Sequence, residues 1–304
     1  MRPPVLLLLA LSLPGCRDIA RALEEHDRVG EPPTKQGSAK RGGDRPKAVS
    51  EAPPPGKGKP KSSPSTGAGD RSIHLELGVP GGVDPSDDHL LVRSQYALSY
   101  SRKRNGPNWV GWNLNAAHFG SVPRHRGKFM PDPLLPQGFY AVRHDDYTDS
   151  GFDRGHMVRS EERTRTPEDN LATFFTTNLL PQRHDLNAGP WLRFEEHCQA
   201  LAQKEGKELF VVAGGIFEGS QSIGRGVAVP RRCFKIVVVL QGGGRLGDVT
   251  AQTEILAVDM PNDTGILGRG WEPYRTTVDR LEQATGYDFL TALPDAIEAA
   301  LEAR

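Results

Sequence analysis

Short runs of apolar, β-branched and aromatic residues, separated by polar turns, recur after residue 72 of this 304-residue chain. Runs of this kind are typical of β-strands. The clearest pair lies at residues 95–101 and 109–114, which are joined by a polar turn at 102–108. The same pattern predicts further strands at residues 139–143, 171–180, 208–212, 234–240 and 254–258.

Helical spacing marks a different set of segments. An apolar stripe at intervals of three or four predicts a helix over residues 189–204. Its members are Trp191, Phe194, Cys198 and Leu201. Similar spacing predicts two more helices at 277–283 and 294–302. Because regular alternation begins at Ile73, we expect one folded domain over residues 73–304.

Residues 1–16 have the pattern of an export signal. The apolar run from Val5 to Leu13 is too short to span a bilayer and has the length of a signal-peptide core. It leads to Cys16 in a sequence that resembles a bacterial lipobox, so we expect Cys16 to be lipidated. The predicted location is the bacterial cell envelope, with the protein anchored to a membrane by this lipid. An ordinary secretory signal, giving a periplasmic or secreted protein, is the alternative.

Residues 17–72 are rich in Pro, Gly, Lys and Ser and poor in large apolar side chains. Such a segment buries too little apolar surface to offset the entropy lost on ordering. We therefore expect a disordered linker that holds the domain at 73–304 away from the membrane.

Formal charge is balanced over the whole chain, with 38 basic and 38 acidic residues, but its distribution is uneven. Residues 93–165 carry 12 Lys and Arg against 7 Asp and Glu. A local excess of positive charge attracts polyanions such as nucleic acids. The balanced total alone would argue against such a partner.

The candidate chemistry is concentrated in residues 151–195. Four residues that carry or permit chemistry stand consecutively there, namely Asp153, Arg154, Gly155 and His156. Four polar side chains follow downstream, namely Asn178, Gln182, Asn187 and Glu195. Phosphodiester hydrolysis needs an activated water, neutralised phosphate charge and a stabilised leaving oxygen. The predicted order is a strand that ends with the motif, a loop, a second strand, a turn and a helix.

His156 is the candidate general base, because imidazole titrates near neutral pH. A metal ligand or a buried structural histidine is the alternative. Asn187 is the candidate ligand of a divalent cation, since Mg²⁺ keeps most of its waters and accepts one or two hard oxygen donors. A helix cap is the alternative role for Asn187. Glu195 would lie about 12 Å farther along one continuous helix, so we do not expect both residues to coordinate one ion directly.

The remaining motif residues have supporting roles in this interpretation. Arg154 is expected to pair with a phosphate oxygen, because guanidinium forms bidentate contacts. Asp153 is close enough in sequence to orient Arg154 or His156, or to contact a metal-bound water. Gly155 is expected to allow a backbone shape that a Cβ would obstruct.

Residues from about 73 to 294 resemble the DNA/RNA non-specific endonuclease family, the ββα-metal or His-Me finger nucleases. The resemblance rests on the motif at 153–156, on residues 177–182, and on Asn187 followed by Glu195. It implies an α+β fold with a mostly antiparallel sheet flanked by helices. It also implies a hydrolase that cleaves DNA and RNA with little sequence specificity.

The same resemblance implies a cofactor and its ligands. The cofactor is Mg²⁺, with Mn²⁺ or another divalent cation as alternatives. Asn187 would hold it directly and Glu195 through a water, while His156 would be the base. Glu196 is the competing choice for Glu195, and a salt bridge is the alternative role for either glutamate.

One position departs from the family pattern. Family members often carry an arginine on the helix shortly after the glutamate, whereas residues 196–200 contain none. Assistance to the leaving group is then expected from one of three arginines, Arg93, Arg159 or Arg163. Asn178 and Gln182 match family positions near the site, and structural roles for both amides remain open.

Two cysteines and two tryptophans leave further alternatives. Cys198 and Cys233 remain once Cys16 is lipidated, and in an exported protein they form either a disulfide or two separate buried thiols. Trp109 and Trp112 could be platforms for base stacking, but at least one of them is expected in the core, because alternating strand positions point to opposite faces.

Two other functions compete with the nuclease interpretation. One is a catalytically weak surface lipoprotein that binds nucleic acid, and the other is a phosphodiesterase that acts on a small molecule. DNA, RNA and the membrane are the predicted partners. A homodimer and an inhibitor protein are left open.

Overall fold

The computed structural model describes residues 72–82 and 84–304. The signal at 1–16, the lipidation site Cys16 and the linker up to residue 71 lie outside these residues, so they stay predictions. Within the described ranges, none of the helices combines the length and hydrophobicity needed to span a bilayer.

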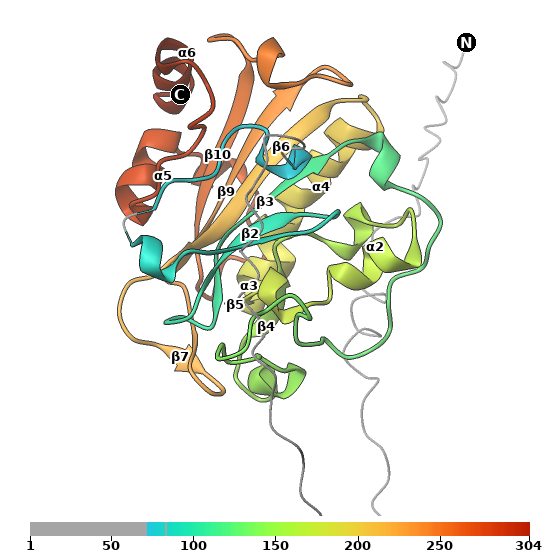
Figure 1. The fold of residues 1–304 in the computed structure, drawn as a ribbon, viewed down its shortest axis with the longest axis vertical. Coiled ribbons are helices and arrows are strands. Elements are labelled where there is room, and N and C mark those ends of the chain that lie inside the picture. The colour runs from blue at the N-terminus through green and yellow to red at the C-terminus, as the bar shows by residue number, and fades with distance from the viewer. Residues whose placement is uncertain (1–71, 83) are drawn as a thin grey trace, which may run out of the picture. The chain divides into compact units, whose positions relative to one another are not determined.

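An antiparallel sheet of six strands forms the centre of the domain (Figure 1). Each neighbouring pair of its strands runs antiparallel. In spatial order the strands are β1 (His89–Val92), β2 (Ala97–Ser101), β3 (Gly106–Leu114), β6 (Glu208–Ile216), β9 (Arg232–Leu240) and β10 (Glu254–Pro261).

Most strands predicted from alternation are confirmed. The pair at 95–101 and 109–114 is the antiparallel pair β2 and β3, and the three later runs lie in β6, β9 and β10. Strand β1 was not predicted. Its four residues His89–Val92 are too few to show a period, and Leu90 and Val92 are exposed although apolar.

Each face of the sheet buries its own hydrophobic cluster. Along β9, Phe234, Ile236 and Val238 belong to one cluster, whereas Cys233 and Val237 belong to the other. This is the alternation expected of a strand whose two faces are both covered.

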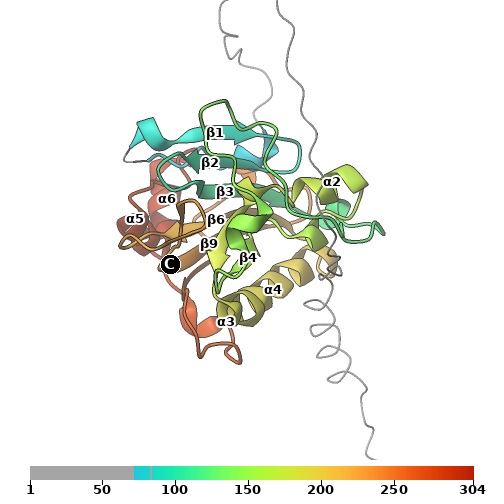
Figure 2. The same ribbon diagram turned by 90° about the horizontal axis from the view of Figure 1, so that it is seen from below.

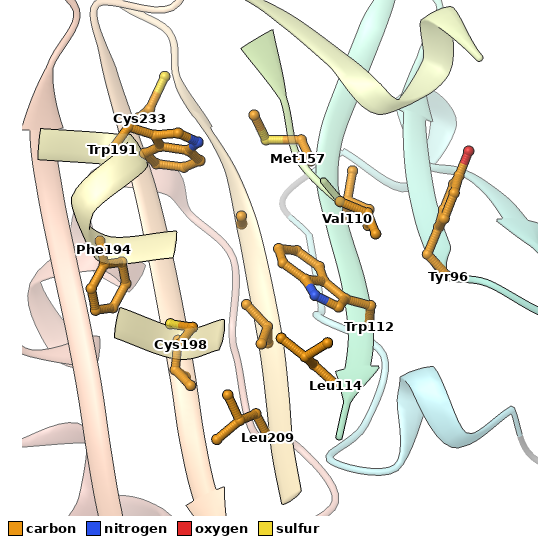
Figure 3. Packing of buried hydrophobic residues seen from close by; sticks show 14 of the residues in the cluster. Tyr96, Val110, Trp112, Leu114, Met157, Trp191, Phe194, Cys198, Leu209 and Cys233 are labelled. Carbon is orange, nitrogen blue, oxygen red and sulfur yellow. The ribbon is translucent and has the colours of Figure 1, made fainter. Parts of the chain in front are cut away.

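Helices cover both faces (Figures 1 and 2). The helix α4 (Leu192–Gln203) packs on the face that carries Val237, and Figure 3 shows Phe194 and Cys198 in this core with Trp112 of β3. The C-terminal helices α5 (Val278–Thr285) and α6 (Asp295–Glu302) pack on the face that carries Ile236. All three helices confirm predicted ones, although α4 begins three residues later than expected because Gly189 is non-helical.

A smaller unit stands on the α4 side of the sheet (Figure 2). It consists of an antiparallel hairpin of two strands followed by helical segments. Its elements are β4 (Asp153–His156), β5 (Leu179–Gln182), α3 (His184–Leu186), a π-helical turn (Asn187–Trp191) and α4. The predicted order of strand, loop, strand, turn and helix is present, but the second strand is β5 and not residues 171–180; the motif forms the whole of β4.

Two predicted strands are wrong. Residues 171–180 contain the end of α2 (Pro167–Ala172) and a 3-10 helix before β5 begins. Thr166 caps α2, which begins at Pro167, because its hydroxyl accepts a hydrogen bond from the Asp169 N–H. Residues 139–143 form no strand, because local side-chain bonds replace a strand ladder. The Arg143 N–H donates to the Asp146 carboxylate.

The remaining elements are short. A small hairpin joins β7 (Ser222–Ile223) to β8 (Val227–Ala228). The 3-10 helices are Ile73–Leu75, Pro85–Asp87, Ala116–His118, His144–Tyr147, Ser160–Glu162, Thr176–Asn178, Leu246–Asp248 and Glu272–Tyr274.

Both tryptophans of β3 are core residues. Trp109 and Trp112 are each 1% exposed and belong to the clusters on opposite faces of the sheet. Stacking of bases on either ring is therefore excluded in this conformation. Cys198 and Cys233 are buried and free, so the interpretation as two separate thiols is the correct one. Burial raises the pKa of each thiol to about 12, which keeps both protonated.

Candidate active site

The hairpin of β4 and β5 fixes the position of the motif. Asp153 stands opposite Gln182, and His156 stands opposite Leu179. The segment after His156 is held by Asn178, whose side-chain oxygen accepts from the Val158 N–H at 3.0 Å and whose amide nitrogen donates to the Val158 carbonyl at 2.9 Å. Asn178 is fully buried, so its role is structural.

Gly155 is required by packing against the neighbouring strand. A Cβ at this position would lie 2.6 Å from Cγ of Gln182 and closer still to its amide oxygen. Gln182 is fully buried and has little room to move. A Cβ would thus be obstructed, as expected, and because Gly155 does not have a positive φ the obstacle is the close approach of Gln182.

His156 lies between two aromatic rings. Its ring centroid is 5.2 Å from that of Phe129 and 5.3 Å from that of Phe174, the latter in an edge-on arrangement. These contacts restrict the orientation of the imidazole. Glu161 lies near His156. Burial alone would raise the pKa of Glu161, but Arg124 and Arg159 lower it to about 2, and His156 lowers it further.

Asn187 is connected to the motif strand through Asp153. The amide nitrogen of Asn187 donates to Oδ2 of Asp153 at 3.0 Å, and Nδ1 of His184 lies 3.0 Å from the same oxygen. Asp153 therefore orients Asn187 and His184. The sequence did not single out His184.

The local backbone explains how Asn187 reaches Asp153. Asn187 has helical φ and ψ at the end of α3, and the non-helical Gly189 separates it from α4, whose N-cap is Trp191. Asn187 is therefore not the N-cap of α4, which was its alternative role. The helix from Asn187 to Glu195 is also interrupted, so the simple helical distance between them does not apply.

Glu195 forms salt bridges inside the protein. Its side chain is almost wholly buried, with Oε1 3.1 Å from Nζ of Lys235 and Oε2 3.3 Å from Nε of Arg159. Burial raises the pKa of Glu195, and the two cations oppose that shift. The salt bridge that the sequence left as an alternative is thus present, while the contact to a cation through water stays a prediction. The competing Glu196 is exposed.

Alternating charges continue from Glu195 toward the surface. Arg159 lies 3.6 Å from Glu161, and Glu161 lies 2.9 Å from Arg124. The order Arg124, Glu161, Arg159, Glu195 and Lys235 therefore runs from partly exposed to buried and passes beside His156. Of its three cations, only Arg124 is appreciably exposed, so only this one can attract a polyanion directly.

Sequence reasoning missed Lys235, although a signal existed. Lys235 interrupts the apolar run of β9 at a position that alternation directs toward α4, and its ammonium lies 4.2 Å from the ring centroid of Trp191. A charge at an inward position of a buried strand indicates a buried partner. No comparable signal marked Arg124 or Glu161.

Arg154 is oriented by a neighbouring loop. Its Nη2 donates to the carbonyl of His144 at 2.9 Å and to the hydroxyl of Thr148 at 3.2 Å, and its guanidinium lies 5.8 Å from the ring centroid of Tyr147. Burial lowers the pKa of Arg154, which nevertheless stays cationic at neutral pH.

The three candidate arginines for the leaving group occupy different environments. Arg93 pairs with Asp132 in the interior, and Arg163 is 1% exposed and donates to backbone carbonyls of Gln95 and Asn113. Both are therefore structural and cannot reach a substrate in this conformation. Arg159 alone of the three contacts Glu195 and lies in the charge series beside His156.

The donor atoms at Asn187 fit a hard divalent cation. Because its amide nitrogen is committed to Asp153, the amide oxygen is the atom that can act as a ligand. A neutral oxygen donor beside a carboxylate is typical of weak magnesium sites that the substrate phosphate completes.

The β4 and β5 hairpin, followed by the helix with Glu195, defines a ββα-metal nuclease fold. Residues 76–296 match the family described as DNA/RNA non-specific endonuclease. The chain belongs to this family.

Relatives of known sequence agree with this assignment. The chain is 42% identical to a nuclease of Nostoc sp. (strain PCC 7120) over 238 residues, which cover 77% of this chain and 86% of the relative. It is 26% identical to the mitochondrial endonuclease G of Homo sapiens, over 68% of this chain and 71% of that protein.

A solved structure shows the same fold. A chain in the crystal structure of the EndoG/EndoGI complex superposes with a TM-score of 0.64 at 24% identity. The match covers 75% of this chain and 95% of that one. The predicted α+β fold is therefore confirmed.

Proposed function

We propose that this protein is a divalent-cation-dependent endonuclease that hydrolyses phosphodiester bonds in DNA and RNA with little sequence specificity. The observation that carries the proposal is the hydrogen bond from Asn187 to Asp153, which joins the motif strand to the helical segment beside it. Membership of a nuclease family supports the activity.

Each residue has a defined task in this mechanism. His156 accepts the proton of the attacking water on its imidazole, whose orientation Phe129 and Phe174 restrict. Arg154 pairs with a non-bridging phosphate oxygen. Asn187 would hold the cation through its amide oxygen, and Asp153 fixes the orientation of that amide. When bound, Mg²⁺ or a similar cation neutralises charge on the phosphate and on the leaving oxygen.

Arg159 is the arginine that we assign to charge stabilisation near the site. It contacts Glu161 and Glu195 and belongs to the series that passes His156. The helix lacks the arginine that family members often carry after the glutamate. The assignment of Arg159 to this role therefore rests on its contacts with Glu161 and Glu195.

The decisive experiment incubates the full chain with plasmid DNA and with RNA, in Mg²⁺ and in EDTA. The expected result is cleavage of both polymers in Mg²⁺ only, with a loss of about 10²–10⁴-fold in His156→Ala. Equal, negligible cleavage by both proteins in Mg²⁺ would sink the proposal, and a gel shift without cleavage would favour a binding protein. Hydrolysis of bis(p-nitrophenyl) phosphate with intact polymers would favour a small-molecule phosphodiesterase.

We further propose that the protein is exported and anchored to the cell envelope through a lipid on Cys16. The lipobox-like sequence that ends at Cys16 supports this location. The full chain expressed in bacteria is expected in the membrane fraction, and Cys16→Ser is expected in the soluble fraction. An unchanged distribution of Cys16→Ser would contradict lipid anchoring.

A further inference from the structure

The side chains of Phe152 and Arg183 meet at the open end of the hairpin of β4 and β5. The last pair of its ladder joins Asp153 to Gln182, so Phe152 and Arg183 are the next residues outward on the two strands. The guanidinium of Arg183 lies 4.2 Å from the ring centroid of Phe152. Its Nη1 also donates to the carbonyl of Gly151 at 3.1 Å. Two contacts therefore hold a partly exposed cation in one orientation.

Arg183 shares one face of this hairpin with the candidate catalytic residues. Because successive strand residues alternate between faces, Phe152, Arg154 and His156 lie on the same face, at steps of about 6.6–6.8 Å. Residues directly opposite each other on paired strands also share a face, which places Arg183 beside Phe152. The hydrophobic cluster beneath this face agrees, since Phe152 packs against it and so does Phe129, the ring that contacts His156. Arg183, Arg154 and His156 thus form a row along one face.

The charge of Arg183 is directed to solvent and not to an acid. None of the ion pairs found in the described part of the chain includes Arg183. The motif acid Asp153 lies on the other face of β4 by alternation, and its Oδ2 already contacts His184 and Asn187. A guanidinium has five N–H donors, and the bond to the Gly151 carbonyl uses one of them. The other donors of Arg183 can bind an anion without loss of that bond.

Arg183 is also connected to the candidate metal ligand through the backbone. Its carbonyl accepts a hydrogen bond from the N–H of Asn187 at 2.9 Å, which closes the single turn of α3. The two side chains therefore leave the same helical turn, that of Arg183 toward Phe152 and that of Asn187 toward Asp153.

We propose that Arg183 binds the backbone phosphate adjacent to the scissile one, and that Phe152 and the Gly151 carbonyl orient its guanidinium for this contact. The inference rests on the proposed endonuclease function, in which the scissile phosphate lies between Arg154 and Asn187. Arg183 touches no reacting atom in this arrangement, so it is a substrate-positioning residue. The preferred substrate then has at least two consecutive phosphates, which a polynucleotide supplies and a simple phosphodiester does not.

Steady-state cleavage of a labelled DNA oligonucleotide by the full chain in Mg²⁺ tests this contact. Arg183→Gln should raise KM by about 5–20-fold, because one charge-assisted contact is lost, and it should leave kcat unchanged. Arg183→Lys keeps the charge and should recover part of the loss. The control is Arg280→Gln, which removes one positive charge at an exposed position of α5 and should behave as the parent.

Two outcomes of the cleavage assay overturn the proposal. One is an equal KM for Arg183→Gln and Arg280→Gln. The other is a fall in kcat of Arg183→Gln at unchanged KM, because that is the effect expected if Arg183 only supports the turn that carries Asn187.

The salt dependence of binding separates a phosphate contact from a structural one. Each phosphate neutralised on a single strand contributes about −0.7 to the slope of log K against log salt concentration. Fluorescence anisotropy of labelled single-stranded DNA with the His156→Ala chain, titrated with KCl at fixed Mg²⁺, measures this slope. Adding Arg183→Gln should make it shallower by about 0.7. Adding Phe152→Leu should weaken binding and keep the slope, because the charge remains.

The binding assay is independent of catalysis, so the two proposals can fail separately. An unchanged slope with Arg183→Gln, or no binding by the His156→Ala chain, overturns the phosphate contact. If the parent cleaves DNA but Arg183→Gln alters neither KM nor the slope, the endonuclease function stands and only the role of Arg183 is wrong. If the parent leaves DNA intact, the endonuclease function fails, while a shallower slope still establishes the phosphate contact.

Discussion

The ammonium of Lys235 lies 3.1 Å from Oε1 of Glu195, where both side chains are removed from solvent. The ring of Trp191 covers this ammonium at 4.2 Å. Strand β9 and helix α4 are thereby joined by a buried ion pair, and the same glutamate contacts Arg159 of the candidate site.

Breaking this pair from one side should be costly. Glu195→Gln leaves Lys235 and Arg159 facing a neutral amide, and we expect a loss of about 3–5 kcal/mol in the free energy of unfolding. Lys235→Met combined with Glu195→Gln should recover part of that loss, because the buried ammonium is removed and Arg159 keeps its pairing with Glu161. Denaturant unfolding of the single and double variants measures both effects, and additive losses would contradict the coupling.

The hydrogen bond between Asp153 and Asn187 predicts that changes at either residue alter the Mg²⁺ dependence of DNA cleavage. Asn187→Ala removes the ligand oxygen, and Asp153→Asn replaces the charged acceptor that orients Asn187 by a neutral amide. Both should raise the Mg²⁺ concentration for half-maximal cleavage by about 10–100-fold. The control is Asp263→Asn, an exposed acid outside the site. An unchanged Mg²⁺ dependence in both site variants would show that Asn187 is not the ligand.

Arg154 should be sensitive to a conservative change. Arg154→Lys keeps the charge but loses the planar fork that the His144 carbonyl and Thr148 hydroxyl orient. We expect a fall in kcat/KM of about 10²–10³-fold on plasmid DNA. Arg143→Lys changes an exposed arginine nearby and should behave as the parent. Activity of Arg154→Lys equal to that of the control would argue against a phosphate contact.

Glu162 should make stability depend on pH. Burial raises its pKa from the ordinary 4.5 to about 7, while its carboxylate accepts a hydrogen bond from Trp112 Nε1 at 3.0 Å. The folded state then holds a proton that the unfolded state has lost, so this group makes stability fall as pH rises from 4.5 to about 7. The upper bound of this loss is roughly 3 kcal/mol.

Glu162→Gln keeps an acceptor for Trp112 and removes the titration. Its free energy of unfolding should fall less than that of the parent between pH 4.5 and pH 7. Glu196→Gln, an exposed glutamate on α4, should retain the parent profile. Parallel pH profiles for the parent and Glu162→Gln would rule out Glu162 as the source.

The sequence predicts those parts of the fold that periodicity controls. Strands β6 and β9 and helix α4 bury regular faces, so their patterns are visible in single segments. Residues 171–180 are different, because Asn170 and Asn178 supply side-chain bonds that fold an apolar run into turns. Strand propensity and hydrophobic alternation do not reveal such side-chain hydrogen bonds to the backbone.

The candidate site likewise has residues that the sequence reveals and contacts that it does not. The motif and Asn187 are recognisable because chemistry restricts the residue types. The contact between Asp153 and Asn187 depends on the break at Gly189, and the pairing of Glu195 depends on strand β9, which follows it in the sequence. The first relationship leaves no local pattern, and the second leaves only the charge of Lys235 in an otherwise apolar strand.

The close packing of Gly155 against Gln182 has an evolutionary consequence. A larger residue at 155 fits only if the side chain at 182 becomes smaller, so these positions are expected to co-vary among homologous sequences. Glycine in the third place of the motif is then inherited because of its neighbour on the adjacent strand. Homologues that replace this glycine should reveal themselves by a compensating change twenty-seven positions later.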